Sequence, residues 1–142
     1  MSNSTSTIIV ALFLIAHGFV HASLSWVPLP KPGAMQTPFL PSWTRSEVSP
    51  TWPISKLGFP DSVIRTLGWI LWLAVTALFV LAGLGLFGLP LLSTLWPKLA
   101  TLGAILSIVL VALYWHPWYI AAPILDLLIL AGVYFKFPSD LF

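Results

Sequence analysis

Residues 7–24 of the chain read TIIVALFLIAHGFVHASL, an apolar run whose only titratable side chains are two histidines. A helix needs about 20 mostly apolar residues to cross the hydrocarbon layer of a membrane. Three further stretches meet this requirement, at residues 62–88, 98–115 and 117–135. The pattern predicts an all-α fold: an integral membrane four-helix bundle that forms one four-span domain over residues 1–142.

The composition agrees with a membrane protein. Of the 142 residues, 58% are hydrophobic and 7% are charged, whereas a soluble domain carries about 25% charged residues. The chain has no cysteine, which excludes thiol catalysis and thiolate metal sites. Its net charge of +2 comes without the clustered basic face that nucleic-acid binding needs. The expected partners are therefore the lipid bilayer and other membrane protein subunits, and no nucleic acid.

Residues 25–61 have a different composition. Most of the 13 prolines of the chain lie here, together with Trp26, Trp43 and Trp52. The prolines exclude regular helix, and tryptophan is typical of the membrane–water interface. We expect an ordered, extended loop on the membrane surface between the first two helices, with a flexible tether as the alternative.

Prolines also mark the expected helix ends. Pro97 precedes the stretch at residues 98–115 and is expected at the start of that helix, where a missing N–H is tolerated. Pro117 opens the fourth stretch and leaves almost no connector after the third, which predicts an antiparallel hairpin. The first seven residues carry no Lys or Arg, so we expect the first segment to be kept as a helix rather than cleaved after Ala22. The few cations leave the orientation in the membrane open.

Asp126 is the charged residue that most requires explanation, because a carboxylate inside a membrane span should face a partner in the bundle. It lies nine residues after Pro117, which places it about 13 Å along the fourth helix at 1.5 Å per residue. His17 lies eight residues before Ser25, about 12 Å from the same end of the bundle. The matched depths predict a contact between His17 and Asp126.

His21 follows His17 by four residues, so both imidazoles should lie on one face of the first helix. The spacing is consistent with a metal site formed by His17, His21 and Asp126. It is also consistent with cofactor binding by His17, His21 or His116, the cofactor being haem, a chlorophyll-type pigment or a quinone. A proton or ion relay along these residues is a further alternative. The simplest alternative is a hydrogen bond between helices that has a purely structural role.

The third stretch carries small residues at Ala100, Gly103, Ala104 and Ser107, spaced by three and four. Such a face allows close helix approach in lipid. Ser107 and Thr76 are polar enough to donate in the core, and each is expected to bond to its own helix backbone.

The sequence offers no catalytic residues, since no nucleophile appears with a base and an orienting group. The expected function is that of a non-catalytic accessory or structural subunit of a larger membrane complex. The alternative is a small-ligand, metal or proton site at His17, His21 and Asp126. Residues 11–24, ALFLIAHGFVHASL, resemble the first helix of DoxX-like small four-helix membrane proteins, which often carry a His-Gly step there. This resemblance implies a four-helix membrane fold and no particular activity.

Overall fold

The computed structural model describes residues 4–25, 58–114 and 117–142. These residues form helices and connecting turns, and none of them is in a strand. The elements in chain order are α1 (Thr5–Ser25), α3 (Asp61–Leu86), α4 (Leu92–Leu113), the 3₁₀ turn η2 (Pro117–Ile120), α5 (Ala121–Phe135) and the 3₁₀ turn η3 (Ser139–Leu141). The predicted all-α class is confirmed for this part of the chain.

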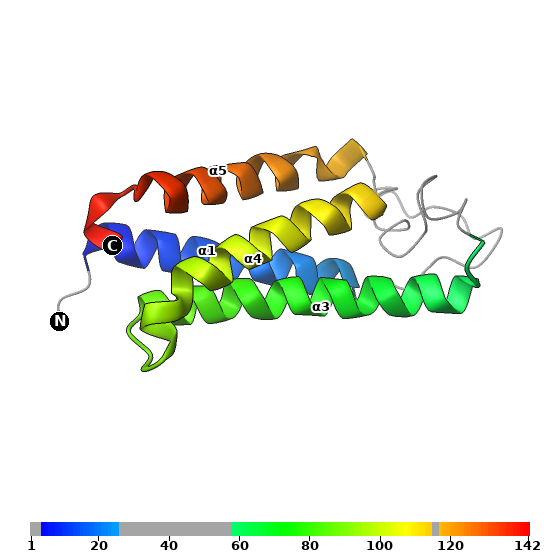
Figure 1. Ribbon diagram of the computed structural model, residues 1–142, viewed down its shortest axis with the longest axis horizontal. Helices are drawn as coiled ribbons and strands as arrows, with labels where there is room; N and C mark the ends of the chain where they lie inside the picture. The colour runs from blue at the N-terminus through cyan, green and yellow to red at the C-terminus, as the bar shows by residue number, and fades with distance from the viewer. Residues whose placement is uncertain (1–3, 26–57, 115–116) are drawn as a thin grey trace, which may run out of the picture.

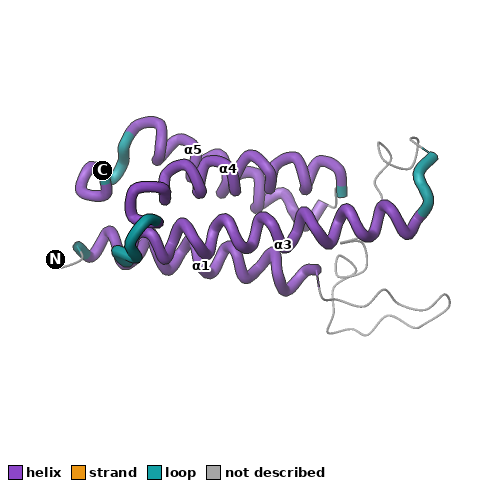
Figure 2. Tube along the Cα trace, turned by 60° about the horizontal axis from the view of Figure 1, so that its bottom comes forward, coloured by secondary structure: helices purple, strands orange, loops and turns teal. Residues whose placement is uncertain are grey.

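The four α-helices run side by side and alternate in direction (Figures 1 and 2). Helix α1 packs along α3, α3 packs along α4, and α4 packs along α5, whereas α1 and α5 make few contacts with each other. The start of α1 and the end of η3 lie at the same end of the bundle, where they contact each other. We call this end the terminal end. The other end, where α1 finishes and α3 begins, we call the loop end.

Three of these helices are long and apolar enough to cross a membrane: Thr5–Ala22, Thr66–Leu86 and Leu92–Leu113. Helix α5 is apolar but shorter. The first two match the predicted stretches at residues 7–24 and 62–88 closely. The predicted surface loop at residues 25–61 lies almost entirely outside the described residues, which resume at Gly58.

The predicted start of the third helix is wrong. Helix α4 begins at Leu92 rather than at residue 98, and Pro97 lies inside it. Proline in a helix removes one hydrogen bond, to the carbonyl four residues earlier. That carbonyl belongs to Ser93, which is exposed in the first turn, so the loss is small there. The helix ends at Leu113. The predicted end at residue 115 lies outside the described residues.

The fourth predicted stretch, residues 117–135, is one 3₁₀ turn followed by an α-helix. Pro123 is the third residue of α5, and the residue four positions before it, Tyr119, belongs to η2. Proline cannot donate the bond that would carry the α-helical pattern back to Tyr119. The α-helix therefore begins after the 3₁₀ turn, and it ends at Phe135 as predicted.

Glycine and small residues let the helices approach closely. A Cβ added at Gly83 of α3 would lie 2.7 Å from the carbonyl oxygen of Ala11 and 2.6 Å from a side-chain carbon of Ile15. A Cβ added at Gly103 of α4 would lie 3.3 Å from the ring of Phe79, which is a tight contact. The small residues predicted to share one face of the third helix are all buried: Ala100, Gly103, Ala104 and Ser107.

Candidate functional site

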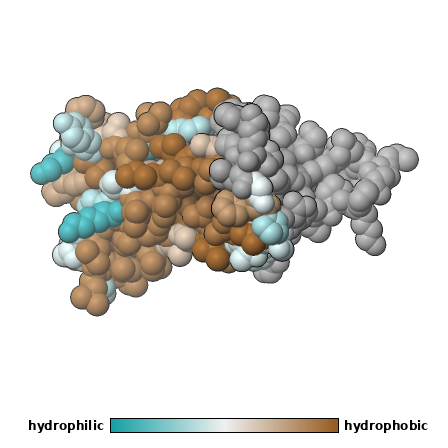
Figure 3. Space-filling view, turned by 45° about the vertical axis from the view of Figure 1, so that its right-hand side comes forward, coloured by the Kyte–Doolittle hydropathy of each residue, from teal (hydrophilic) through white to brown (hydrophobic). Residues whose placement is uncertain are grey.

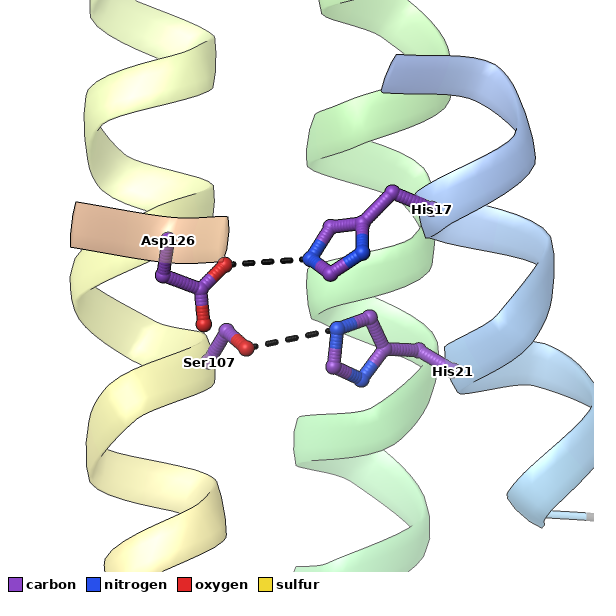
Figure 4. Close-up of polar contacts among 4 residues, drawn as sticks. All are labelled: His17, His21, Ser107 and Asp126. Carbon is purple, nitrogen blue, oxygen red and sulfur yellow. Dashed lines mark hydrogen bonds and ion pairs between the residues drawn. The ribbon is translucent and has the colours of Figure 1, made fainter. Parts of the chain in front are cut away.

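The predicted contact between His17 and Asp126 is present. Nε2 of His17 on α1 lies 3.1 Å from Oδ1 of Asp126 on α5 (Figure 4). The two side chains are 6% and 0% exposed. This hydrogen bond joins two helices that otherwise make few contacts with each other. The imidazole donates and the carboxylate accepts, whether His17 is neutral with its proton on Nε2 or carries a positive charge.

A second polar contact lies one turn further along α1. Nε2 of His21 is 3.3 Å from Oγ of Ser107 on α4. The rings of His17 and His21 are 5.0 Å apart, so both project from the same face, as the spacing predicted. The sequence did not identify Ser107 as a partner of His21. The parallel expectation for Thr76 is confirmed, because its hydroxyl donates to the backbone carbonyl of Trp72 at 2.9 Å.

Aromatic rings enclose both histidines. On α3, Phe79 meets the His17 ring edge to face at 4.8 Å, and Trp72 lies 5.2 Å from the His21 ring. On α1, the ring of Phe13 stacks on His17 at 5.9 Å. His21 is 2% exposed. The four polar residues His17, His21, Ser107 and Asp126, which we call the polar cluster, are therefore surrounded by apolar groups.

Two atoms of the polar cluster remain unpaired. Nδ1 of His21 and Oδ2 of Asp126 are buried and have no hydrogen-bond partner among the described residues. An unsatisfied buried polar group costs about 1–3 kcal/mol. The structure therefore places two uncompensated polar atoms in one small region of the core, and each requires a physical or functional reason.

Hydrogen-bond accounting indicates which proton positions suit the cluster. If Ser107 donated to Nε2 of His21, the ring proton would sit on Nδ1 and leave a buried donor unpaired. If His21 instead donates from Nε2 to Oγ of Ser107, Nδ1 carries only a lone pair. Nδ1 of His21 and Oδ2 of Asp126 have no partner among the described residues in either arrangement. The second arrangement places a lone pair rather than an N–H group at the buried Nδ1, and it leaves the hydroxyl proton of Ser107 free of the bond to His21.

A cavity of about 300 Å³ lies between α1, α4 and α5, beyond the polar cluster toward the terminal end. Phe13, Trp96, Ile129 and Phe142 are among its lining residues, and none of the residues that line it is titratable. The ring of Phe142 packs 5.0 Å from that of Trp96 across the end of the bundle. The cavity therefore offers only apolar contacts, directly next to the polar cluster.

The predicted metal ligands do not gather into one group. Within residues 4–25, 58–114 and 117–142, no set of three or more His, Cys, Asp or Glu side chains is placed to hold a metal ion. His17 bonds to Asp126, whereas His21 bonds to Ser107. His116, a predicted cofactor ligand, lies outside the described residues. Haem, pigment or metal binding at these positions remains a prediction.

No family model, curated protein or solved structure matches this chain.

Proposed function

We propose that the chain is an integral membrane protein whose four helical segments all span the bilayer. Three α-helices have the required length and apolar character. Residues 117–135 add a 3₁₀ turn to α5. At rises of about 2.0 and 1.5 Å per residue, the two together extend about 30 Å. This equals the thickness of the hydrocarbon core of a typical bilayer, about 30 Å.

The surface supports this setting. Large apolar side chains are exposed along every helix, and most of the described surface in Figure 3 is hydrophobic. The exposed lysines Lys98 and Lys136 lie toward the terminal end, where a long side chain can reach the headgroups. A water-soluble protein would rarely expose so large an apolar area.

Reversible proton binding in the polar cluster is the function that we assign to this membrane protein. The observation that carries the proposal is the 3.1 Å contact between His17 and Asp126, with both side chains buried. Ionisable residues inside a bilayer are costly, and they commonly belong to proton or ion pathways. The carboxylate has a free oxygen that can accept a proton, and the imidazole is hydrogen-bonded to its other oxygen.

A non-catalytic accessory subunit is the second candidate. It is favoured by the outward face of α5, where Ile124, Leu127 and Leu128 are each more than half exposed. Helix α5 packs mainly on α4, which leaves this face available to another membrane protein. A subunit of this kind would be degraded when it is produced without its partner, whereas a protein that works alone would accumulate.

The experiment is infrared difference spectroscopy on the protein in mild detergent, recorded between two pH values. Proton binding at Asp126 gives a band from a protonated carboxyl group that disappears in Asp126→Asn. The matched control is Asp140→Asn near the end of the chain, which should keep the band. A band that persists in Asp126→Asn would overturn the proposal.

An absorption spectrum and a metal analysis of the same sample test the cofactor prediction. A haem or pigment band, or about one metal ion per chain, that vanishes in His17→Ala would replace proton binding with a cofactor role. A colourless, metal-free sample leaves proton binding as the proposal for the infrared experiment to test.

A further inference from the structure

We infer that His21 and Ser107 form a proton-transfer path that connects Asp126 to the loop end of the bundle only. The inference rests on the proposed function and specifies the route by which protons reach the site. Its two ends are the unpaired buried atoms of the polar cluster, Nδ1 of His21 and Oδ2 of Asp126.

The positions of the four residues support such a path. His21 lies four residues from the end of α1, on the loop side of His17. Its Nε2 contacts Ser107 at 3.3 Å. In Figure 4, Oδ1 of Asp126 bonds to His17, whereas Oδ2 points away from that bond, toward the level of Ser107 and His21. Ser107 thus bonds to the imidazole that can receive a proton, and Oδ2 of the carboxylate that can hold it has no partner of its own among the described residues.

The transfer balances at each atom. A proton binds the lone pair of Nδ1 on His21, and the ring releases the proton on Nε2 to Oγ of Ser107. Ser107 passes its own hydroxyl proton to Oδ2 of Asp126, either after a small side-chain rotation or through one bridging water molecule. The carboxylate becomes a neutral carboxyl group. His21 is left with its proton on Nδ1, and Ser107 now donates to Nε2, so the reverse sequence returns the proton.

The path ends at Asp126 because the described residues next to it on the terminal side offer no further titratable group. Beyond His17 lie the stacked ring of Phe13 and the apolar cavity, whose lining has no titratable residue. Helix α3 faces the two histidines with the rings of Trp72 and Phe79. The exposed cations Lys98 and Lys136 are near the opposite end. Protons are therefore expected to enter and leave from one side, without net flow across the membrane.

Among the described residues on the loop side of the cluster, Tyr119 and Tyr114 also carry titratable groups, both of them aromatic hydroxyls. Tyr119 of η2 packs its ring 6.0 Å from that of Trp72, and Trp72 in turn contacts His21. Tyr114, at the end of α4, is also buried on the loop side. Both carry a phenolic hydroxyl group, so among the described residues around the path the carboxylate of Asp126 and the imidazole of His17 are the acidic and basic partners.

The test is the rate at which the Asp126 carboxyl band appears after a rapid drop in pH. Ser107→Ala is expected to slow this rate about 100-fold, the lower range for a positioned proton-transfer group, while the final size of the band stays the same. Ser107→Thr, which keeps a hydroxyl at the same position, should retain a rate close to that of the unmodified protein. His21→Gln provides a second variant, because its amide can bond to Ser107 but cannot take up the proton.

The outcomes separate the path from the function on which it depends. An Asp126 band that forms at the unmodified rate in both Ser107→Ala and His21→Gln would overturn the path and keep proton binding at Asp126. Absence of the band in the unmodified protein would overturn the proposed function itself. Purified protein in vesicles adds a check, because sustained proton flow across the bilayer would contradict a path that opens on one side.

Discussion

The two halves of the bundle core are held by different interactions. Toward the loop end, His17 and His21 of α1 hydrogen-bond to Asp126 and Ser107 on two other helices. Toward the terminal end, Trp96 and Phe142 close the bundle by ring packing, and a cavity of about 300 Å³ remains between α1, α4 and α5. The same helices therefore enclose the hydrogen-bonded polar cluster at one level and line a partly open apolar cavity at the other.

The difference shows what each kind of contact can do. Dispersion contacts are weak individually and depend on close packing, so α1 and α5 do not close the space between them in the apolar half. A hydrogen bond is directional and fixes two particular atoms relative to each other. The 3.1 Å bond between His17 and Asp126 thus sets the spacing of two helices that pack poorly.

The largest effect is expected at Gly83, where α3 packs closely against α1 and so supports both halves of the core. Gly83→Leu should lower the free energy of unfolding by about 3 kcal/mol, because its Cβ would overlap the backbone of Ala11 on α1 and overpacking of this kind is costly. Unfolding of the detergent-solubilised protein measures the effect. Ala77→Leu adds the same side chain to an exposed position of α3 and should change stability little. Equal effects of the two changes would contradict the close seam between α1 and α3.

A smaller effect is expected when the polar half is broken. Asp126→Leu should cost about 2 kcal/mol, because it leaves the buried Nε2–H of His17 without an acceptor. His17→Phe keeps the ring and removes the bond. A double-mutant cycle of these two changes should give a coupling energy of about 1 kcal/mol, within the range measured between membrane helices. Additive effects would show that the two side chains do not interact.

The smallest effect is expected when the apolar half is filled. Val10 lines the cavity, and Val10→Ile adds one methyl group to the empty space. We expect a gain of about 0.5 kcal/mol in unfolding free energy, since cavity filling commonly stabilises a protein by small amounts. Val109→Ile makes the same change on an exposed position of α4 and should be neutral. A loss of stability in Val10→Ile would mean that this half of the core is already fully packed.

Much of this architecture can be predicted from the sequence, because the length of an apolar helix and the depth of a residue along it both follow from counting residues. Counting residues from Pro117 and from Ser25 placed Asp126 and His17 at matching depths, and their contact is confirmed. The count succeeds because rise per residue is nearly constant in a helix and because a buried carboxylate requires a partner.

The errors concern features that counting does not determine. Pro97 suggested a helix start, but an exposed first turn tolerates proline inside α4. The contact between His21 and Ser107 depends on how α4 is rotated about its axis, which is set by packing against α1 and α3. Ser107 was already placed on the small-residue face. The neighbouring His21, however, could not be identified from the spacing of one helix alone.

In the membrane-spanning arrangement that we propose, the hydrogen bond between α1 and α5 affects how the chain is inserted into the bilayer. A carboxylate at the centre of a single helix adds about 2.5–3.5 kcal/mol to the cost of membrane insertion, and α5 is the shortest of the four helices. Synthesis proceeds from the first helix to the last, so His17 is already in the membrane when Asp126 leaves the ribosome. Helix α1 thus supplies the hydrogen-bond partner that lowers the cost of inserting α5. A chain that starts at α3 would expose Asp126 to the lipid without this partner.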